Sequence, residues 1–497
     1  MPLFSIITIL GSIYIVFRND TLKNKYRYML IFSAIAETIR IRGLFIPGGA
    51  GGIAQATVLQ FVTVFLAILL LFKQKNKPSV SFFTIATLFL SSVLIGGGYE
   101  YVNTFDQPVI PRHLSNDVVG SAWDWFIAGM VARQVEPYSI TEFLSGFLKV
   151  VFIVFNIYCI KSICDWKDIG FIVNRLIYIL KCYLIVVYVE FFLKNIFNMA
   201  DLWPDIQQLF CGAFAPGDLN QAPDKRGTFY SLIGFTQEPS FLVMSFAVLL
   251  FLVFIANKVN QKYPGQTILP YTPRYQIVLI LLPMLVSGGF SSVWYILNLA
   301  VIYYIISNDV SSKSLLYQCV LFFRFSVPLI LILGLLYAFI QLSDSNYSMR
   351  IEAVQLFLTS LFTTGTLPFN IMTDTSVLAR FSSIVLTFKD FLARPIFGLG
   401  VGMEFAHCFS VTMLADFGIL GSYLWWKLLM CSQYKGVKYD YCALFIYFWI
   451  IGLIAGDFGV RFLRQFSNLI LVEATCLYCS NIPQNYFLST EKAEVDK

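Results

Sequence analysis

The stretch FLVMSFAVLLFLVFIA, residues 241–256, contains no charged side chain. A helix that crosses the hydrocarbon core of a bilayer needs about 20 mainly apolar residues, and this stretch supplies most of one. Similar stretches follow one another along the chain, although the second also contains Glu37, Arg40 and Arg42. The thirteen expected spans are Leu3–Phe17, Tyr28–Phe45, Ile53–Phe72, Ser79–Ile95, Gly146–Ile160, Leu176–Phe197, Phe241–Ala256, Tyr275–Phe290, Ser292–Ser307, Leu315–Gln341, Phe409–Met430, Tyr441–Val460 and Phe466–Cys479.

The composition agrees with this pattern. The 497 residues are 58% hydrophobic and only 13% charged, about half the charged share of a soluble domain. We therefore expect an all-α fold, a single polytopic transmembrane helix bundle of about 12–14 spans over residues 1–497. The first stretch is expected to be a span and not a signal peptide, because no basic region precedes it. The net charge of +6 does not indicate nucleic acid, because Lys and Arg lie mainly in short loops.

The orientation follows from these short loops, since Lys and Arg concentrate on the cytoplasmic side of membrane proteins. If the spans alternate, every basic cluster falls on one side, together with the tail 481–497. The opposite, external side receives three long segments: Gly96–Ser145, Asn198–Ser240 and Leu342–Cys408. The basic clusters are Arg18 with Lys23, Lys25 and Arg27; Lys73 with Lys75 and Lys77; Lys258 with Lys262 and Arg274; Lys313; and Lys435 with Lys438.

The last external segment holds one group of candidate residues. Residues 374–392 have apolar side chains at helical spacing after helix-starting Asp374, which predicts an amphipathic helix at the membrane interface, with Arg380 in its first turns. A glycine-rich run, Gly398–Gly402, is expected to be flexible, and His407 follows it. Gly418 and Gly421 lie near the helical face of His407, so another helix is expected to approach closely there. His407 could equally be a solvated residue that caps the span.

The second external segment ends at Arg226, Glu238 and Pro239, directly before a span. Pro239 suits the first turn of a helix, and Glu238 would then lie at the positive end of the helix dipole. Glu238 could be a helix cap only. Arg226 could pair with Glu238 or bind an anionic ligand, because a guanidinium matches phosphate oxygens.

Several Arg residues, one His and one Glu at one membrane face indicate a lipid-linked phosphate substrate. Arg would neutralise a departing diphosphate, and His or Glu would accept a proton from an attacking hydroxyl. No Asp-x-Asp occurs in the chain, so the sequence predicts neither a metal nor another cofactor. Cys476 and Cys479 form a CxxC without a second pair, which indicates ordinary buried residues, and whether Cys211 and Cys408 pair is open.

These residues resemble the superfamily of O-antigen polymerases (Wzy) and O-antigen ligases. The similarity covers roughly residues 226–421. One departure is the turn Ser287–Ser292, where many relatives carry a Ser-Arg pair and this chain has no Arg. The matching motifs are Arg226 to Ser240, Asp374 to Arg380, Pro395-Ile-Phe-Gly398-Leu-Gly400, and His407 with Gly418 and Gly421, where Cys408 replaces the usual polar residue.

The resemblance implies the glycosyltransferase type C architecture and a metal-independent enzyme at the periplasmic face of the bacterial inner membrane. The substrates would be glycans carried on undecaprenyl diphosphate. Arg226 and Arg380 would hold the donor diphosphate, with Arg350 or Arg394 supplying the missing charge. His407 or Glu238 would orient or deprotonate the acceptor hydroxyl. A chain-length regulator and a flippase would be possible partners.

Four functions remain open. The altered ligase motif and the Glu238-Pro239-Ser240 segment favour a polymerase over a ligase, which would transfer the finished glycan to lipid A core. A flippase or other transporter would place charged residues in the middle of several spans, where Arg324 and Asp457 are the main candidates. A structural membrane scaffold would need none of these Arg, His and Glu residues.

Overall fold

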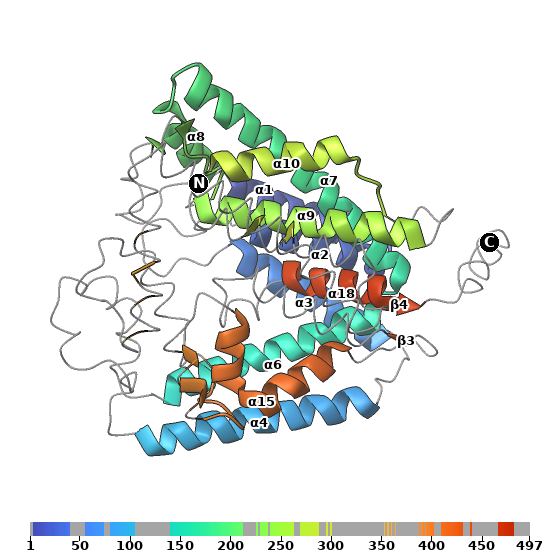
Figure 1. Cartoon of the computed structure of the whole chain (residues 1–497). Coiled ribbons are helices and arrows are strands. Elements are labelled where there is room, and N and C mark those ends of the chain that lie inside the picture. Colours follow the sequence, from blue (N-terminus) through green and yellow to red (C-terminus); the bar gives the residue numbers. More distant parts are fainter. Residues whose placement is uncertain are drawn as a thin grey trace.

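The computed structural model describes most of the expected spans (Figure 1). The described elements are helices apart from two short pairs of antiparallel strands. The structure describes residues 3–39, 55–73, 80–104, 140–211, 225–226, 229–236, 239–262, 269–287, 394–401, 409–430, 438–439 and 466–481, with a few single residues and pairs between 295 and 392.

Helix α9, Pro239–Lys262, contains the stretch quoted above and lies at the centre of one group of helices. Among the described elements it packs against four helices, and 89% of its most apolar stretch is buried. A helix buried on all sides has no polar face, which explains why residues 241–256 contain no charged side chain. Their one polar side chain, Ser245, donates a hydrogen bond to the carbonyl of Thr38. The four neighbours are α2 (Leu22–Ile39), α7 (Trp166–Phe191), α10 (Arg274–Val286) and α18 (Phe466–Cys479).

A second group of helices lies beside the first (Figure 1). It contains α4 (Val80–Thr104), α6 (Ile140–Ile163) and α15 (Phe409–Met430), with α15 packed along α4. Helix α3, Gln55–Lys73, joins the two groups because it packs against both α2 and α6. The first helix, α1 (Leu3–Phe17), packs on α2, α3 and α8 (Leu202–Cys211).

Four of these helices are long and apolar enough to cross a membrane: Ser81–Val102, Phe143–Ile163, Trp166–Ile196 and Leu242–Lys262. Three shorter apolar helices accompany them. Large apolar side chains are exposed along their outer faces, including Leu10 and Phe17 of α1. Exposed apolar surface of this kind suits contact with lipid. The chain is therefore a helical membrane protein, and the total number of spans stays a prediction.

The helix ends differ from the expected spans at several places. Helix α7 begins at Trp166, ten positions before Leu176, because Asp165 caps it and forms a reciprocal capping box with Asp168. Helix α2 begins at Leu22, six positions before the expected Tyr28, and Glu37 within it is buried and accepts a hydrogen bond from Gln60 of α3 at 2.5 Å. The expected spans Ser292–Ser307, Leu315–Gln341 and Tyr441–Val460 lie wholly or largely outside the described residues.

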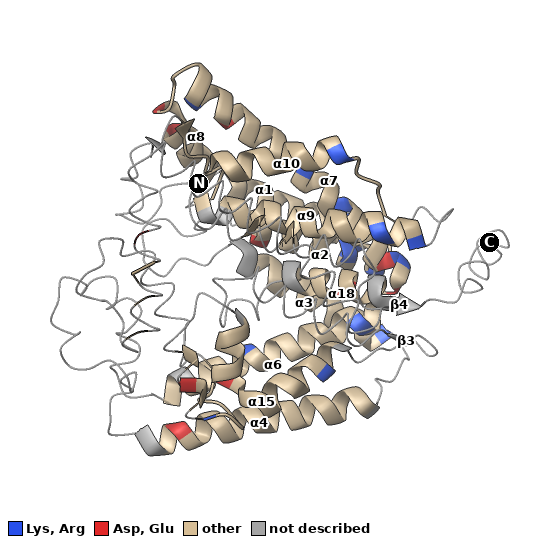
Figure 2. Ribbon diagram, viewed as in Figure 1, with Lys and Arg blue, Asp and Glu red and all other residues tan. Residues whose placement is uncertain are grey.

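The basic residues gather at one end of the bundle (Figure 2). Two turns meet there, because Lys23 and Arg27 of α2 form ion pairs with Asp168 of α7 at 2.6 and 2.7 Å. The same end holds the antiparallel pair of β3 (Lys438–Tyr439) and β4 (Ser480–Asn481), which joins the residues after α15 to those after α18. Basic ends on one side are what alternating spans predict, and which side of the membrane they face stays a prediction.

Candidate functional site

Helix α15 is broken at Gly418, whose φ of 64° and ψ of −174° are not helical. A break leaves backbone N–H and C=O groups without helical partners, which is costly in an apolar environment. The segment 395–400 supplies the partners by pairing with the chain on both sides of the break. The hydrogen bonds run from Leu399 N to Ala415 O (2.8 Å), Gly400 N to Asp416 O (3.0 Å), Ile419 N to Pro395 O (2.7 Å) and Leu420 N to Ile396 O (3.1 Å).

Glycines make this close approach of backbones possible. A Cβ on Gly418 would collide with the carbonyl of Ile396, and one on Gly398 would lie 2.5 Å from the carbonyl of Asp416. On the other side of the segment, a Cβ on Gly96 of α4 would lie 2.5 Å from the carbonyl of Phe397, and one on Gly146 of α6 would lie 2.6 Å from that of Val401. The segment therefore lies against α4, α6 and the break in α15.

Two expectations about these glycines need correction. Gly398 and Gly400 were expected in a flexible run, but both are buried and hydrogen-bonded, with φ of 73° and 99°. The segment that approaches Gly418 closely is the loop 395–400 and not another helix. The expected helix contact is confirmed at Gly421, where an added Cβ would lie 3.3 Å from Ser92 Oγ of α4.

Arg394 begins this segment and is held by α4. Its Nε lies 2.6 Å from Oε1 of Glu100, a residue only 1% exposed, and its guanidinium carbon lies 4.9 Å from the centre of the Tyr99 ring. The Arg394 side chain itself remains 30% exposed. Within the described part of the chain, Nε is the one atom of this guanidinium with a hydrogen-bonding partner. The terminal amino groups are the part that a phosphate could contact.

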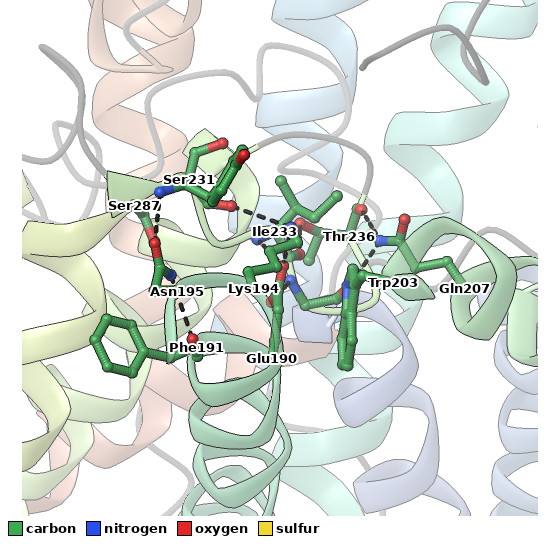
Figure 3. A network of polar contacts seen from close by, with 12 residues as sticks. Glu190, Phe191, Lys194, Asn195, Trp203, Gln207, Ser231, Ile233, Thr236 and Ser287 are labelled. Atoms are coloured by element: carbon green, nitrogen blue, oxygen red, sulfur yellow. Dashed lines mark hydrogen bonds and ion pairs between the residues drawn. The ribbon is translucent and has the colours of Figure 1, made fainter. Parts of the chain in front are cut away.

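A second polar centre lies where α7 ends (Figure 3). Glu190 and Lys194 form an ion pair of 2.5 Å, and their side chains are 0% and 4% exposed. The carboxylate of Glu190 accepts hydrogen bonds from the backbone N–H groups of Ile233 (3.0 Å) and Gly234 (2.7 Å). Lys194 donates to the carbonyl of Ser231 at 3.1 Å. One buried ion pair therefore binds the backbone of three residues in the loop 231–236.

Neighbouring side chains fix the same loop from other directions. The chain after α7 forms a π-helix, η1 (Phe192–Ile196), which is uncommon and is often found at functional sites. Asn195 within it accepts a hydrogen bond from the N–H of Tyr230 at 2.6 Å. Trp203 and Gln207 of α8 both donate to the carbonyl of Gly234, which has a φ of 57°. The loop is thus anchored from α7, η1 and α8 together.

This loop belongs to the segment that carries Arg226 and Glu238. Arg226 lies in β1 (Lys225–Arg226), and its backbone pairs with Phe229 of β2 (Phe229–Tyr230). The side chain of Arg226 lies outside the part of the chain that the structure describes. Helix α9 begins at Pro239, which confirms the expected position of this proline in a first turn. Four predicted site residues, Glu238, Arg350, Arg380 and His407, lie outside the described residues.

Glu100, Glu190 and Lys194 were not among the predicted site residues. A signal for two of them was present, because Glu190 and Lys194 are charged residues four positions apart inside the expected span Leu176–Phe197. Glu100 gave no such signal, since it was placed in the external segment that begins at Gly96. The mid-span candidates Arg324 and Asp457 lie outside the described residues.

Cysteines and metal-binding residue types add little to the two centres. Cys211 of α8 is a buried free thiol that donates to the carbonyl of Phe235 at 3.7 Å, and burial raises the pKa of this thiol to about 12. Cys408 lies outside the described residues, and Cys476 is buried as expected. Among the residues that the structure describes, no three His, Cys, Asp or Glu side chains are grouped to hold a metal ion.

The two polar centres lie toward the end of the bundle opposite the basic turns (Figures 1 and 2). One is the Arg394–Glu100 pair beside the segment 395–401, and the other is the Glu190–Lys194 network around the loop 231–236. Comparison of the chain with protein-family models, with curated proteins and with solved structures finds no match.

Proposed function

We propose that this chain polymerises oligosaccharide repeat units carried on undecaprenyl diphosphate into O-antigen or another surface polysaccharide. The reaction takes place at the periplasmic face of the bacterial inner membrane and needs no metal. The proposal rests on the resemblance of the motifs between Arg226 and Gly421 to the polymerase and ligase superfamily, and on the chemistry of the residue types in them.

The observation that carries the proposal is the pairing of two of these motifs in space. The motif at Pro395–Gly400 and the glycine motif at Gly418 and Gly421 are separate in the sequence. In the structure the first fills the break that the second creates in α15. Arg394 stands at the edge of this unit, with its guanidinium partly exposed and tethered through Nε. Motif residues that build one rigid support for an arginine suit the binding of a phosphate group.

The proposed reaction uses the external arginines as charge donors. The acceptor hydroxyl attacks the anomeric carbon of the donor sugar, a new glycosidic bond forms, and the bond from that carbon to the diphosphate oxygen breaks. Arg226 and Arg380 stabilise the charge on the departing undecaprenyl diphosphate, with Arg394 or Arg350 as a further contact. The hydroxyl proton passes to His407 or Glu238.

Two other functions compete with this one. A ligase would carry out the same bond exchange with lipid A core as the acceptor. A flippase is favoured by the break in α15, because interrupted helices form the binding sites of many transporters. The buried charges within the described spans favour an enzyme instead, since Lys161 pairs with Glu473 at 2.9 Å and Glu190 pairs with Lys194. Charges paired in this way anchor helices and a loop.

The test is a reconstitution of the purified protein in liposomes with lipid-linked repeat units, in the presence of EDTA. The wild-type protein should convert single repeats into a ladder of longer glycans. Arg226→Ala and Arg380→Ala should each lower the rate by about a hundred- to a thousandfold, because each removes one preorganised charge donor. Lys at either position should restore only part of the rate, because an ammonium makes no paired contacts.

The control is Lys167→Ala, which changes a basic residue near the start of α7, at the other end of the bundle. Its ladder should equal that of the wild-type protein. Normal ladders from both arginine variants would exclude the proposed site. Repeats that cross the liposome membrane without becoming longer would indicate a flippase.

A further inference from the structure

The Glu190–Lys194 pair is buried at a place where apolar residues would cost less free energy to bury. Two charges removed from water stabilise a fold little unless further hydrogen bonds satisfy them. Here both charges have such bonds, and the bonds that the pair makes outside its own helix end on the backbone of the loop 231–236. The pair therefore determines the position of a loop more than the packing of two helices.

The loop is short and leads directly to the start of α9. Its backbone is held at Tyr230 by Asn195, at Ser231, Ile233 and Gly234 by the ion pair, and at Phe235 by the hydroxyl of Tyr183, which accepts its N–H at 2.9 Å. Gly234 is confined further, because a Cβ at this position would collide with the Tyr183 hydroxyl. Figure 3 shows the ion pair beneath the loop. The loop 231–236 connects the hairpin containing Arg226 to residue 238, which directly precedes α9.

We propose that Glu190 and Lys194 are positioning residues, which fix the loop 231–236, and with it the preceding β1–β2 hairpin that contains Arg226, in the position that the lipid-linked diphosphate substrate requires. The inference rests on the proposed function for the reaction that the two residues serve. Misplacement of reacting groups by about 1 Å can reduce a rate about a hundredfold. Removal of the pair should therefore lower kcat and leave KM for the lipid-linked donor nearly unchanged.

The variant Glu190→Gln tests this, because the amide keeps the shape of the carboxylate but removes its charge. Glu473→Gln is the matched control, since Glu473 also forms a buried ion pair between elements, with Lys161, at side-chain exposures of 9% and 7%. The milder variant Asn195→Ala removes the acceptor for the Tyr230 N–H from a half-buried position, together with a weaker hydrogen bond of 3.3 Å from Asn195 to the carbonyl of Phe191. Asn195→Ala therefore still tests the proposal if Glu190→Gln does not fold.

The first measurement is hydrogen–deuterium exchange of the folded protein in detergent. Glu190→Gln should speed exchange of the amides at Ile233 and Gly234 by about ten- to a hundredfold, because each loses a hydrogen bond to a charged acceptor. Asn195→Ala should speed exchange at Tyr230 by a smaller factor. Glu473→Gln should leave the amides of residues 230–236 unchanged. Unchanged exchange in Glu190→Gln would overturn the inference, whatever its activity.

The second measurement is polymerisation in liposomes, with rates expressed per folded protein. Glu190→Gln should lower kcat about a hundredfold, whereas Glu473→Gln should leave kcat unaltered even if it lowers the melting temperature equally. Faster exchange with an unchanged kcat would overturn the positioning role alone. An inactive wild-type protein would refute the proposed function, and the reaction assigned to this pair would fall with it.

Discussion

At the scale of single residues, Arg394 is the predicted site residue whose side chain the structure places. Arg394→Ala should lower polymerisation by about a hundredfold or more, because it removes a charge donor that Glu100 already holds in position. Glu100→Gln should lower it less, since the amide oxygen can still accept from Nε. The assay is ladder formation in liposomes.

The control for Arg394 is Arg18→Ala. Arg18 is an exposed arginine in the turn after α1, where it lies 3.7 Å from Asp20. Its replacement should leave the ladder unchanged. Equal loss in Arg18→Ala and Arg394→Ala would show that overall charge, and not the position of Arg394, determines the rate.

Gly418 and Gly98 provide a matched pair of glycines for a stability measurement. Gly418→Ala should be destabilising by more than about 1 kcal/mol, because its φ is positive and the new Cβ meets the carbonyl of Ile396. Gly98→Ala should be neutral or stabilising by up to about 1 kcal/mol, since it lies in helix α4 with open space at the Cβ position. Thermal melting in detergent compares the two. A lower melting temperature for Gly98→Ala than for Gly418→Ala would contradict the described break.

The sequence indicates which residue types could bind a substrate, but it does not indicate which residues contact them in the fold. Arg394 was a candidate because guanidinium suits phosphate, and this reasoning needs no coordinates. Its tether to Glu100 spans almost three hundred positions of the chain, and no local pattern indicates such a contact. Likewise, Gly418 was expected to admit a neighbour, but a helical projection assumes an unbroken helix and therefore gives the wrong neighbour.

At the scale of elements, the turns between α1 and α2 and between α6 and α7 are joined by ion pairs that depend on pH. Burial alone would raise the pKa of Asp165, but the N–H of Asp168 and the ammonium of Lys23 outweigh it and lower this pKa below 3.8. A lowered pKa means that the folded state favours the charged carboxylate. Its contribution is therefore present at neutral pH and is lost as the pH falls below 3.8 through the folded value.

Asp165→Asn isolates this contribution, because Asn remains a good helix cap and carries no charge. At pH 7 the variant should be less stable than the wild-type protein by less than about 1 kcal/mol, since the Asp165 side chain is 46% exposed and its ion pair is screened by solvent. The difference between their melting temperatures should disappear in acid well below pH 3.8. A difference that persists unchanged in acid would contradict the assigned role of this carboxylate.

The positions of the helices could be predicted, and several of their ends could not. The apolar runs at Leu3–Phe17, Phe409–Met430 and Phe466–Cys479 coincide with α1, α15 and α18. Helix α4, in contrast, continues through Gly96–Gly98 to Thr104, beyond the expected end at Ile95. Glycines usually weaken a helix, but here the backbone of segment 395–401 packs against Gly96 and Gly97. Tertiary contacts, which a hydrophobicity pattern does not contain, explain why the helix continues past Ile95.

At the scale of the whole molecule, the basic turns gather at one end and the two polar centres lie toward the other (Figure 2). The excess of Lys and Arg should place the first end in the cytoplasm. Reporter fusions after Lys262 and Lys438 should therefore give cytoplasmic signals, and fusions near Gln221 and Ser345 should give external signals. Signals from the same side for both sets would contradict the proposed topology and the external site.

The most direct test of the proposed function is the length of surface glycans in a strain that lacks this chain. Loss of the polymerase should leave lipid A core that carries at most one repeat unit, with no ladder of longer chains. The gene for the wild-type chain should restore the ladder, and the gene for the Arg394→Ala variant should restore it only weakly. A complete loss of glycan from lipid A core would indicate a ligase, and an unchanged ladder would contradict the proposed function.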